Sequence, residues 1–322
     1  MAPEQITDVA VIALPLRTKF RGLSVRELMI FRGSERWAEF SPFVEYSDAE
    51  AANWLKASLS WANEPAPPLF RGAISVNATL PAVGVDRVAQ VLSQFGTFGT
   101  VKIKVAEAGQ SLADDLARIR RVRDLYPNVK MRLDANGGYS VAQAFEVAQS
   151  LTEFNLEYLE QPVASVAELV QLRTRLSDSG LQIKIAADES IRKADDPLLV
   201  AKEGAADIAV LKVQPMGGIA QALSIAEQSG LEVVVSSALE SSIGISQGLH
   251  LAGALPNLNY DCGLATANLL AADIVSQTLH AVNGEIEIRE VAPSEALIEE
   301  YRADKERESW WRDRLQRCLG LL

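Results

Sequence analysis

Three short acidic motifs follow apolar stretches of the chain, and each places a carboxylate where a predicted strand ends. RLDANGGYS contains Asp134, LEQP contains Glu160 and ADES contains Asp188. Carboxylates of this kind can bind a hard divalent cation or transfer protons. Because the motifs recur at similar intervals, we interpret the three carboxylates as parts of one site.

Lysine is the second residue type with a spacing that suggests chemistry. Lys102 and Lys104 are two positions apart in an apolar stretch, so on a strand they point to the same side. Arg132 and Asp134 have the same relation, and Lys212 ends a later apolar stretch. Cations on the inner side of a sheet need nearby anions, because an uncompensated buried charge is costly. The sequence therefore predicts lysines and carboxylates in contact.

The histidine content excludes several other mechanisms. The chain has only two histidines, His250 and His280, and no HExxH or GxSxG motif. A histidine-rich zinc site and a serine hydrolase elbow are therefore excluded. Acid–base chemistry must depend mainly on Lys, Asp, Glu or Tyr.

Charge and composition narrow the classes of partner. The net charge of -11 argues against nucleic acid or an anionic membrane and leaves a small molecule as the expected partner. We expect no obligate protein partner. The two cysteines are far apart, and no apolar run reaches the roughly 18 residues of a membrane span. The N-terminal region lacks the basic start of a secretory signal, so the predicted location is cytoplasmic.

The first 72 residues have the pattern of a small α+β unit. Three β-rich stretches, 6–14, 25–33 and 35–43, are separated by turn residues. A polar loop with an exposed Phe20 is predicted at 18–24. The capping box SDAE predicts a helix from residue 47, and the Pro-rich stretch 63–70 ends the unit.

From residue 73 the pattern changes to strands that alternate with helices. Predicted strands begin at residues 74, 100, 129, 156, 183, 207, 231 and 257. Strict alternation indicates a parallel sheet, and this number of units indicates a barrel. An open doubly wound sheet would be expected to carry GxGxxG after its first strand, and that motif is absent. We therefore predict an α/β fold with a TIM-type (β/α)7β barrel over residues 73–283.

The predicted barrel is followed by a segment that we expect to complete the first unit. EIEIREVAP, from residue 285, reads as a strand that returns to the N-terminal strands. The charged tail reads as an amphipathic helix that Trp310 and Trp311 pack against the molecule. The predicted domains are an α+β capping domain, residues 1–72 completed by 284–322, and the barrel, residues 73–283.

In a barrel of this kind every strand opens at the same face, where active sites form. The polar residues predicted there are Lys102, Lys104, Asp134, Asn136, Glu160, Asp188, Glu189, Lys212, Ser236 and Ser237. Three converging carboxylates predict a site for Mg²⁺. A lysine beside a divalent cation can act as a base, so the predicted reaction begins with removal of a proton α to a carboxylate. The metal would hold the resulting enediolate.

This order of residues resembles the enolase superfamily, and KIK with the later lysine resembles its muconate-lactonizing-enzyme subgroup. Within the subgroup, several stretches are similar to the o-succinylbenzoate synthase family. They are FRGLSVRE, WAEFSPFVEYSDAEAANWL, VNATLPA, RLDANGGYS, LEQP, ADES and SSALESSIG. The resemblance covers essentially the whole chain.

The resemblance implies Mg²⁺-dependent syn-dehydration of 2-succinyl-6-hydroxy-2,4-cyclohexadiene-1-carboxylate (SHCHC) to 2-succinylbenzoate, in menaquinone biosynthesis. It implies that Asp134, Glu160 and Asp188 bind Mg²⁺, with Mn²⁺ as an alternative. It implies that Lys104 removes the proton and that Lys212 stabilises the enediolate or accepts the proton. Lys102 would assist the substrate carboxylate or tune Lys104.

The remaining predictions concern residues around these groups. Asn136 and Glu189 are expected near the metal, behind its ligands. The predicted substrate contacts are Arg132, Ser236, Ser237, Phe20 and Arg21. Two alternatives stay open on the sequence: an N-acylamino acid racemase or dipeptide epimerase, which would use the same lysines, and a non-catalytic binding barrel.

Overall fold

The N-terminal part of the chain forms an antiparallel sheet. The computed structural model describes residues 6–154, 156–194 and 196–322. Within these ranges, the first sheet has the order β1–β2–β3, built from β1 (Thr7–Phe20), β2 (Leu23–Arg32) and β3 (Trp37–Phe40). Many of their apolar side chains enter the core, including the consecutive Leu28, Met29, Ile30 and Phe31 of β2.

The turn between β1 and β2 differs from the predicted loop at 18–24. The two strands extend into it and leave only Arg21 and Gly22 between them. Both residues have positive φ, 50° and 78°, as in a two-residue hairpin turn. The prediction of an exposed Phe20 is wrong: its side chain is only 8% exposed, because the hairpin turns the ring toward the barrel.

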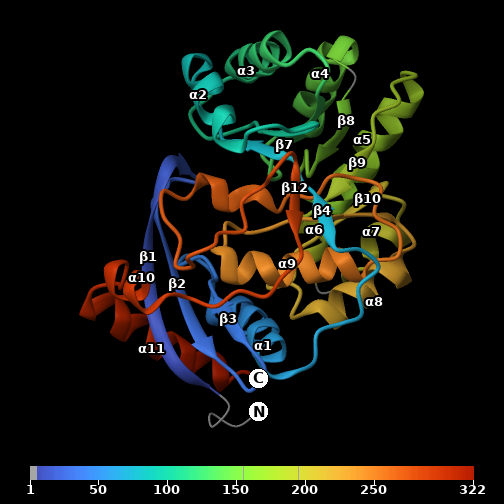
Figure 1. Cartoon of the computed structure of the whole chain (residues 1–322). Helices are drawn as coiled ribbons and strands as arrows, with labels where there is room; N and C mark the ends of the chain where they lie inside the picture. Colours follow the sequence, from blue (N-terminus) through green and yellow to red (C-terminus); the bar gives the residue numbers. More distant parts are fainter. Residues whose placement is uncertain (1–5, 155, 195) are drawn as a thin grey trace.

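Two helices cover the N-terminal sheet, and they come from opposite ends of the sequence. They are α1 (Asp48–Asn63), which Ser47 caps by accepting from Glu50 N, and α11 (Lys305–Leu319). Figure 1 shows the red C-terminal helices beside the blue strands β1 and β2. Trp311 is fully buried, and its Nε1 donates to Glu27 of β2 at 2.9 Å. Trp310 is half-buried and lies against Arg307.

The centre of the chain forms a curled parallel sheet. Within the described part of the chain, this sheet has seven strands in the order β11–β10–β9–β8–β7–β6–β5. The strands are β5 (Ala78–Leu80), β6 (Thr100–Lys104), β7 (Lys130–Asp134), β8 (Leu156–Glu160), β9 (Ile185–Ala187), β10 (Ile208–Leu211) and β11 (Glu232–Val235). Spatial order equals chain order, so the predicted TIM-type α/β barrel is confirmed.

Helices separate the strands and cover the outside of the sheet (Figure 1). They are α2 (Val88–Leu92), α3 (Leu112–Leu125), α4 (Val141–Ser150), α5 (Val166–Asp178), α6 (Glu189–Arg192), α7 (Leu199–Lys202), α8 (Ile219–Ser229) and α9 (Ser242–Ala254). Reciprocal capping boxes begin α3, α4 and α5, as their sequences predict.

The predicted eighth strand at 257–262 is not a strand. The barrel is closed there by two bridges, Cys262 with Val76 and Gly263 with Ser236. The residues just before the bridges are held by a side-chain hydrogen bond rather than by backbone pairing, since Tyr260 Oη donates to Glu232 at 2.7 Å. Gly263 permits the close approach, because a Cβ there would lie 2.5 Å from Ser236 Oγ.

The predicted strand at 74–81 divides between two sheets. Its first part is β4 (Ala73–Ser75), which pairs antiparallel with β12 (Glu285–Glu287), and its last part is β5. The prediction that 285–293 returns to the N-terminal strands is therefore wrong. Figure 1 shows β12 beside β4 at the barrel.

The C-terminal segment reaches β1 only later in the chain, where Ala303 N donates to Val11 O at 2.9 Å. The segment 276–294 also holds α9, through Ser246 Oγ to Arg289 O. The last short helix is α10 (Glu295–Glu300).

Replacing Trp311 by Ala should destabilise the protein by about 3–5 kcal/mol, because it removes a fully buried indole and leaves a cavity. Trp310→Ala is the matched control and should cost less, because that ring is half-buried. The two variants are compared by urea unfolding midpoints. Equal losses in the two variants would contradict the packing described for α11.

Candidate active site

Three carboxylates lie side by side at the carboxyl ends of adjacent strands. Asp134 ends β7, Glu160 ends β8 and Asp188 follows β9 directly. Asp134 is the register partner of Glu160 in the sheet. All three side chains are buried, because alternation along the strands turns them toward the barrel interior.

Three lysines approach these carboxylates from β6 and from the end of β10. Lys102 Nζ lies 2.9 Å from Glu160 Oε1 and 3.4 Å from Asp134 Oδ2. Lys104 Nζ lies 2.5 Å from Asp134 Oδ2, and Lys212 Nζ pairs with Asp188. The structure therefore brings together all six residues predicted to bind the metal or carry out the reaction.

Burial and neighbouring charges perturb the carboxyl groups in different directions. Burial would raise the pKa of Asp134, but Lys104 and Lys102 hold it well below its usual range. Burial would also raise the pKa of Asp188, but Lys212 and Arg192 lower it to about 2. Burial and the charge of Asp134 raise the pKa of Glu160 to about 7, even with Lys102 beside it. Three lysines therefore face three carboxyl groups, and Glu160 is the one whose charged form is stabilised least.

This set of carboxylates suits a divalent cation. Oxygen ligands from Asp134, Glu160 and Asp188 are those that hard cations prefer. Among the residues that the structure describes, no three His, Cys, Asp or Glu side chains are already arranged around a common metal position. The reason is visible in the contacts: each carboxylate is turned toward a lysine. The three side chains fit a cation by type and strand position, provided that they turn away from the lysines.

Residues behind the carboxylates hold them in place. Asn136 accepts from Lys104 Nζ at 2.7 Å and donates to Glu189 at 3.2 Å. Arg192 donates to Glu189 at 2.8 Å and to Asp188 at 3.2 Å. Asn136 and Glu189 were predicted near the ligands. Arg192 was not, although its position four residues after Asp188 on a short helix was a usable signal.

Gln161 is a second supporting residue that sequence reasoning missed. It is fully buried, and its Oε1 accepts from the backbone N of Asp188 at 3.0 Å and of Ser190 at 3.1 Å. The side chain after Glu160 therefore fixes the backbone that carries Asp188. Its position in the sequence gives no sign of this role, because Gln161 and Asp188 follow different strands and meet only in the folded structure.

A cavity of about 40 Å³ lies above the ion pairs, with room for only a few water molecules. Its polar lining includes Lys102, Lys104, Asp134, Asn136, Glu189, Lys212, Ser236 and Ser237, and its aromatic wall is formed by Phe20, Phe43, Tyr46 and Trp54. Glu160 and Asp188 lie beneath this lining. A substrate with a ring would require some of these side chains to move.

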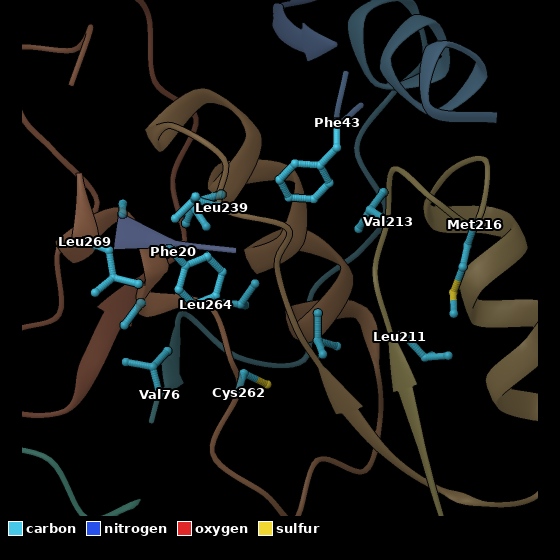
Figure 2. Packing of buried hydrophobic residues seen from close by; sticks show 14 of the residues in the cluster. Phe20, Phe43, Val76, Leu211, Val213, Met216, Leu239, Cys262, Leu264 and Leu269 are labelled. Atoms are coloured by element: carbon cyan, nitrogen blue, oxygen red, sulfur yellow. The ribbon is translucent and has the colours of Figure 1, made fainter. Parts of the chain in front are cut away.

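Four of the five predicted substrate contacts line this cavity: Phe20, Arg21, Ser236 and Ser237. Arg21 is held by Tyr46 Oη at 3.2 Å and lies over the ring of Phe43 at 4.3 Å. Figure 2 shows Phe20 and Phe43 within the packed cluster that also contains Leu239.

Arg132 is the exception, and its prediction is corrected. It points into the barrel as alternation requires, but one layer deeper than Asp134. Its Nε pairs with Glu157 at 2.5 Å, and its guanidinium lies 4.8 Å from the ring centroid of Tyr158. It also donates to Asp261 O at 2.6 Å. Arg132 therefore pairs with an acid other than the three site carboxylates and does not line the cavity.

The N-terminal sheet holds the barrel loop that carries Ser236 and Ser237. Arg26 of β2 is buried and donates to Leu239 O at 3.1 Å and Ala238 O at 3.3 Å. Leu239 has a positive φ of 65°, a conformation that needs support from its surroundings. Gln214 accepts from Ser41 N at 3.2 Å and connects the loop after Lys212 to the end of β3.

Glu39 of β3 completes this support. Its Oε2 accepts from Ser241 N at 3.0 Å, from Ser241 Oγ at 2.5 Å and from Gly244 N at 3.2 Å, so it binds the N-terminus of α9. Burial, and then the charge of Glu240, raise the pKa of Glu39 to about 7. A lone acid in an apolar strand was the only sequence signal for this contact.

The raised pKa of Glu39 makes stability depend on pH. A carboxyl group with a raised folded-state pKa stabilises the fold below its ordinary pKa of 4.5, and this contribution is lost as pH rises through about 7. Glu39→Gln keeps an acceptor oxygen without the charge. Relative to wild type, the variant should gain up to about 3 kcal/mol in unfolding free energy between pH 5 and pH 8.

The measurement is urea unfolding at both pH values. Glu306→Gln, at an exposed position on α11, is the control and should follow the wild type. A Glu39→Gln variant with the same pH dependence as wild type would show that folding does not raise the pKa of Glu39.

Comparisons with known proteins agree with this architecture. Family models match residues 85–293 as enolase C-terminal domain-like and residues 11–62 as enolase N-terminal domain-like. A muconate lactonizing enzyme from Pseudomonas fluorescens has a TM-score of 0.76 at 20% identity, covering 93% of this chain and 99% of that one. An N-succinyl Arg/Lys racemase from Bacillus cereus has a TM-score of 0.75 at 19% identity, covering 93% and 98%. At this identity the structures establish the fold alone.

Sequence relatives are much closer. An o-succinylbenzoate synthase from Mycolicibacterium smegmatis is 49% identical over 313 residues, which is 97% of this chain and 95% of the relative. One from Mycobacterium tuberculosis (strain H37Rv) is 48% identical over 313 residues, 97% and 94% of the two chains. The chain therefore belongs to the enolase superfamily, in the family of the o-succinylbenzoate synthases that it matches over almost its whole length.

Proposed function

We propose that this protein is an o-succinylbenzoate synthase, a lyase that removes water from SHCHC to give 2-succinylbenzoate in menaquinone biosynthesis. The observation that carries the proposal is the placement of Lys104 and Lys212. They reach one cavity from different strands, with three buried carboxylates between them. Relatives with that name at 46–49% identity support the choice of reaction.

Asp134, Glu160 and Asp188 are the proposed ligands of Mg²⁺, with Mn²⁺ as a substitute. Their oxygen donors and adjacent strand positions support this assignment. When bound, the cation supplies positive charge that stabilises negative charge developing on the substrate carboxylate. Asn136 and Glu189 are joined by a hydrogen bond and help to orient the side chains around the proposed ligands.

Lys104 is the proposed base. Its Nζ is at the cavity, held between Asp134 and Asn136, so it can be aimed at the α-proton of a bound carboxylate. The same Nζ then protonates the hydroxyl group as it leaves, and this reuse from one face gives syn elimination. Lys104 gains one proton from the substrate and returns one proton to the leaving hydroxyl group, so the protons balance.

Lys212 and Lys102 are the proposed electrostatic partners. Lys212 comes from the opposite side of the barrel mouth and lines the same cavity, so its positive charge can face the enediolate from the second face. Lys102 is buried between Glu160 and Asp134, where it can assist the substrate carboxylate or tune Lys104.

The wider organisation follows from the same proposal. We place the capping domain at residues 1–72, completed by the part of 284–322 that follows β12, and the catalytic barrel at residues 73–283. Ser236, Ser237, Phe20 and Arg21 contact the substrate. The partner is a small carboxylate in the cytoplasm, with no nucleic acid, membrane or obligate protein partner. Among the described residues, the structure contains no helix long and apolar enough to span a membrane.

Purified protein with Mg²⁺ and SHCHC should form 2-succinylbenzoate, followed by absorbance, and EDTA should abolish the reaction until Mg²⁺ is restored. A panel of N-succinylamino acids runs in parallel. Racemisation of a succinylamino acid without dehydration of SHCHC would favour the racemase alternative. Activity that survives EDTA would argue against the three-carboxylate metal site.

Lys104→Ala should lower the dehydration rate by roughly 10²- to 10⁴-fold, because the base is removed. Mg²⁺ binding, measured by calorimetry, should persist, since all three carboxylates remain. Lys202→Ala, at an exposed lysine that pairs only with Asp196 among the described residues, is the control and should keep full activity. Normal turnover by Lys104→Ala would remove Lys104 from its proposed role.

A further inference from the structure

A second cavity, of about 300 Å³, adjoins the small cavity above the ion pairs. The two share Phe20, Arg21, Lys104 and Asn136 in their linings. The remaining lining of the second cavity comes from the β1–β2 hairpin, the segment after β5 and the loop after β6. These residues are Thr18, Lys19, Gly22, Pro81, Ala82, Val83, Gly84, Arg87 and Glu107. A molecule that extends from the ion pairs past Phe20 would enter this space.

The charged residues that line the second cavity are mainly positive, although the net charge of the chain is -11. Lys19, Arg21, Arg87 and Lys104 face a single acid, Glu107. Lys104 is committed to Asp134, and Arg21 to Tyr46, Phe43 and, at 4.0 Å, Glu45. In the described parts of the chain, Lys19 and Arg87 have no carboxylate within salt-bridge distance. Positive charge without a protein partner favours an anionic ligand.

Lys19 and Arg87 belong to different walls of the cavity. Lys19 is near the end of β1, while Arg87 ends the short turn η2 (Val85–Arg87) that follows β5. Arg87 Nη2 lies 3.5 Å from the hydroxyl of Thr18, a buried residue next to Lys19. Lys19 leaves the strand on the other side from Thr18, but both cations line this cavity. A guanidinium there can bind both oxygens of a carboxylate.

The proposed substrate has two carboxylates, and only one of them lies next to the proton that is removed. The other ends a flexible succinyl chain. The inner cavity, with room for a few water molecules, cannot enclose both. We infer that the second cavity binds the tail carboxylate of the substrate, with Arg87 and Lys19 as its cationic ligands. This inference rests on the proposed function.

The test uses Arg87→Gln and two ligands, 2-succinylbenzoate and its tail amide, which has the same shape without the tail charge. Binding is measured by calorimetry in the presence of Mg²⁺. The wild type should bind the acid roughly 10- to 100-fold more tightly than the amide. Arg87→Gln should lose most of this preference while its affinity for the amide changes little. In turnover, its KM for SHCHC should rise more than its kcat falls.

Two further variants keep the test specific. Lys19→Gln should reduce the same preference, and Arg120→Gln, at an exposed position on α3 that lines neither cavity, should not. Equal weakening of acid and amide by Arg87→Gln would overturn the inference, as would a wild type that binds both ligands equally or binds neither. Absence of dehydration by the wild type would instead reject the proposed reaction, since the binding titrations do not depend on turnover.

Discussion

Buried opposite charges compensate one another at the carboxyl ends of β6 to β10, and the surrounding elements must keep them together. Asp134, Glu160 and Asp188 are removed from water, and each would be costly to ionise there alone. Lys102, Lys104 and Lys212 provide the opposite charges. Each lysine makes the carboxylates tolerable in the fold and, in the proposed reaction, also acts on the substrate. Ligand binding would exchange one set of charge contacts for another.

The site also depends on contacts between the two parts of the molecule. The loop with Ser236 and Ser237 belongs to the barrel, but Arg26 and Glu39 of the N-terminal sheet hold its backbone and the helix after it. The same sheet places Phe20 and Arg21 over the cavity. A barrel alone would lack both the aromatic wall and the support of a strained residue, Leu239. The N-terminal sheet thus shapes the cavity, while the barrel supplies its charged groups.

The sequence was sufficient for the charged groups because alternation along a strand and the common opening of all strands determine their direction. These rules located Asp134, Glu160, Asp188 and the three lysines. These rules do not determine how deep in the barrel a side chain lies. Arg132 was therefore predicted at the cavity, although its partner is Glu157, one layer below. Phe20 was expected in solvent because a polar stretch gives no sign of a tight hairpin that turns one ring inward.

Contacts between distant segments were beyond the sequence pattern for a similar reason. The closure of the barrel by Cys262 and Gly263 depends on a close approach to Ser236 that no periodicity encodes. The hold of Gln161 on Asp188 and that of Glu39 on α9 are cross-element hydrogen bonds from single polar residues. The pairing of β12 with β4 required the spatial arrangement, because a short apolar strand fits any exposed edge.

A crystal structure of the protein with Mg²⁺ and 2-succinylbenzoate would show directly how these charged groups bind the metal and the ligand. We expect one cation bound by Asp134, Glu160 and Asp188, each turned away from its lysine. The ring of the ligand should lie between Lys104 and Lys212, one on each face. A structure in which the carboxylates keep their lysine partners, with the cation or the ligand bound elsewhere, would contradict this expectation.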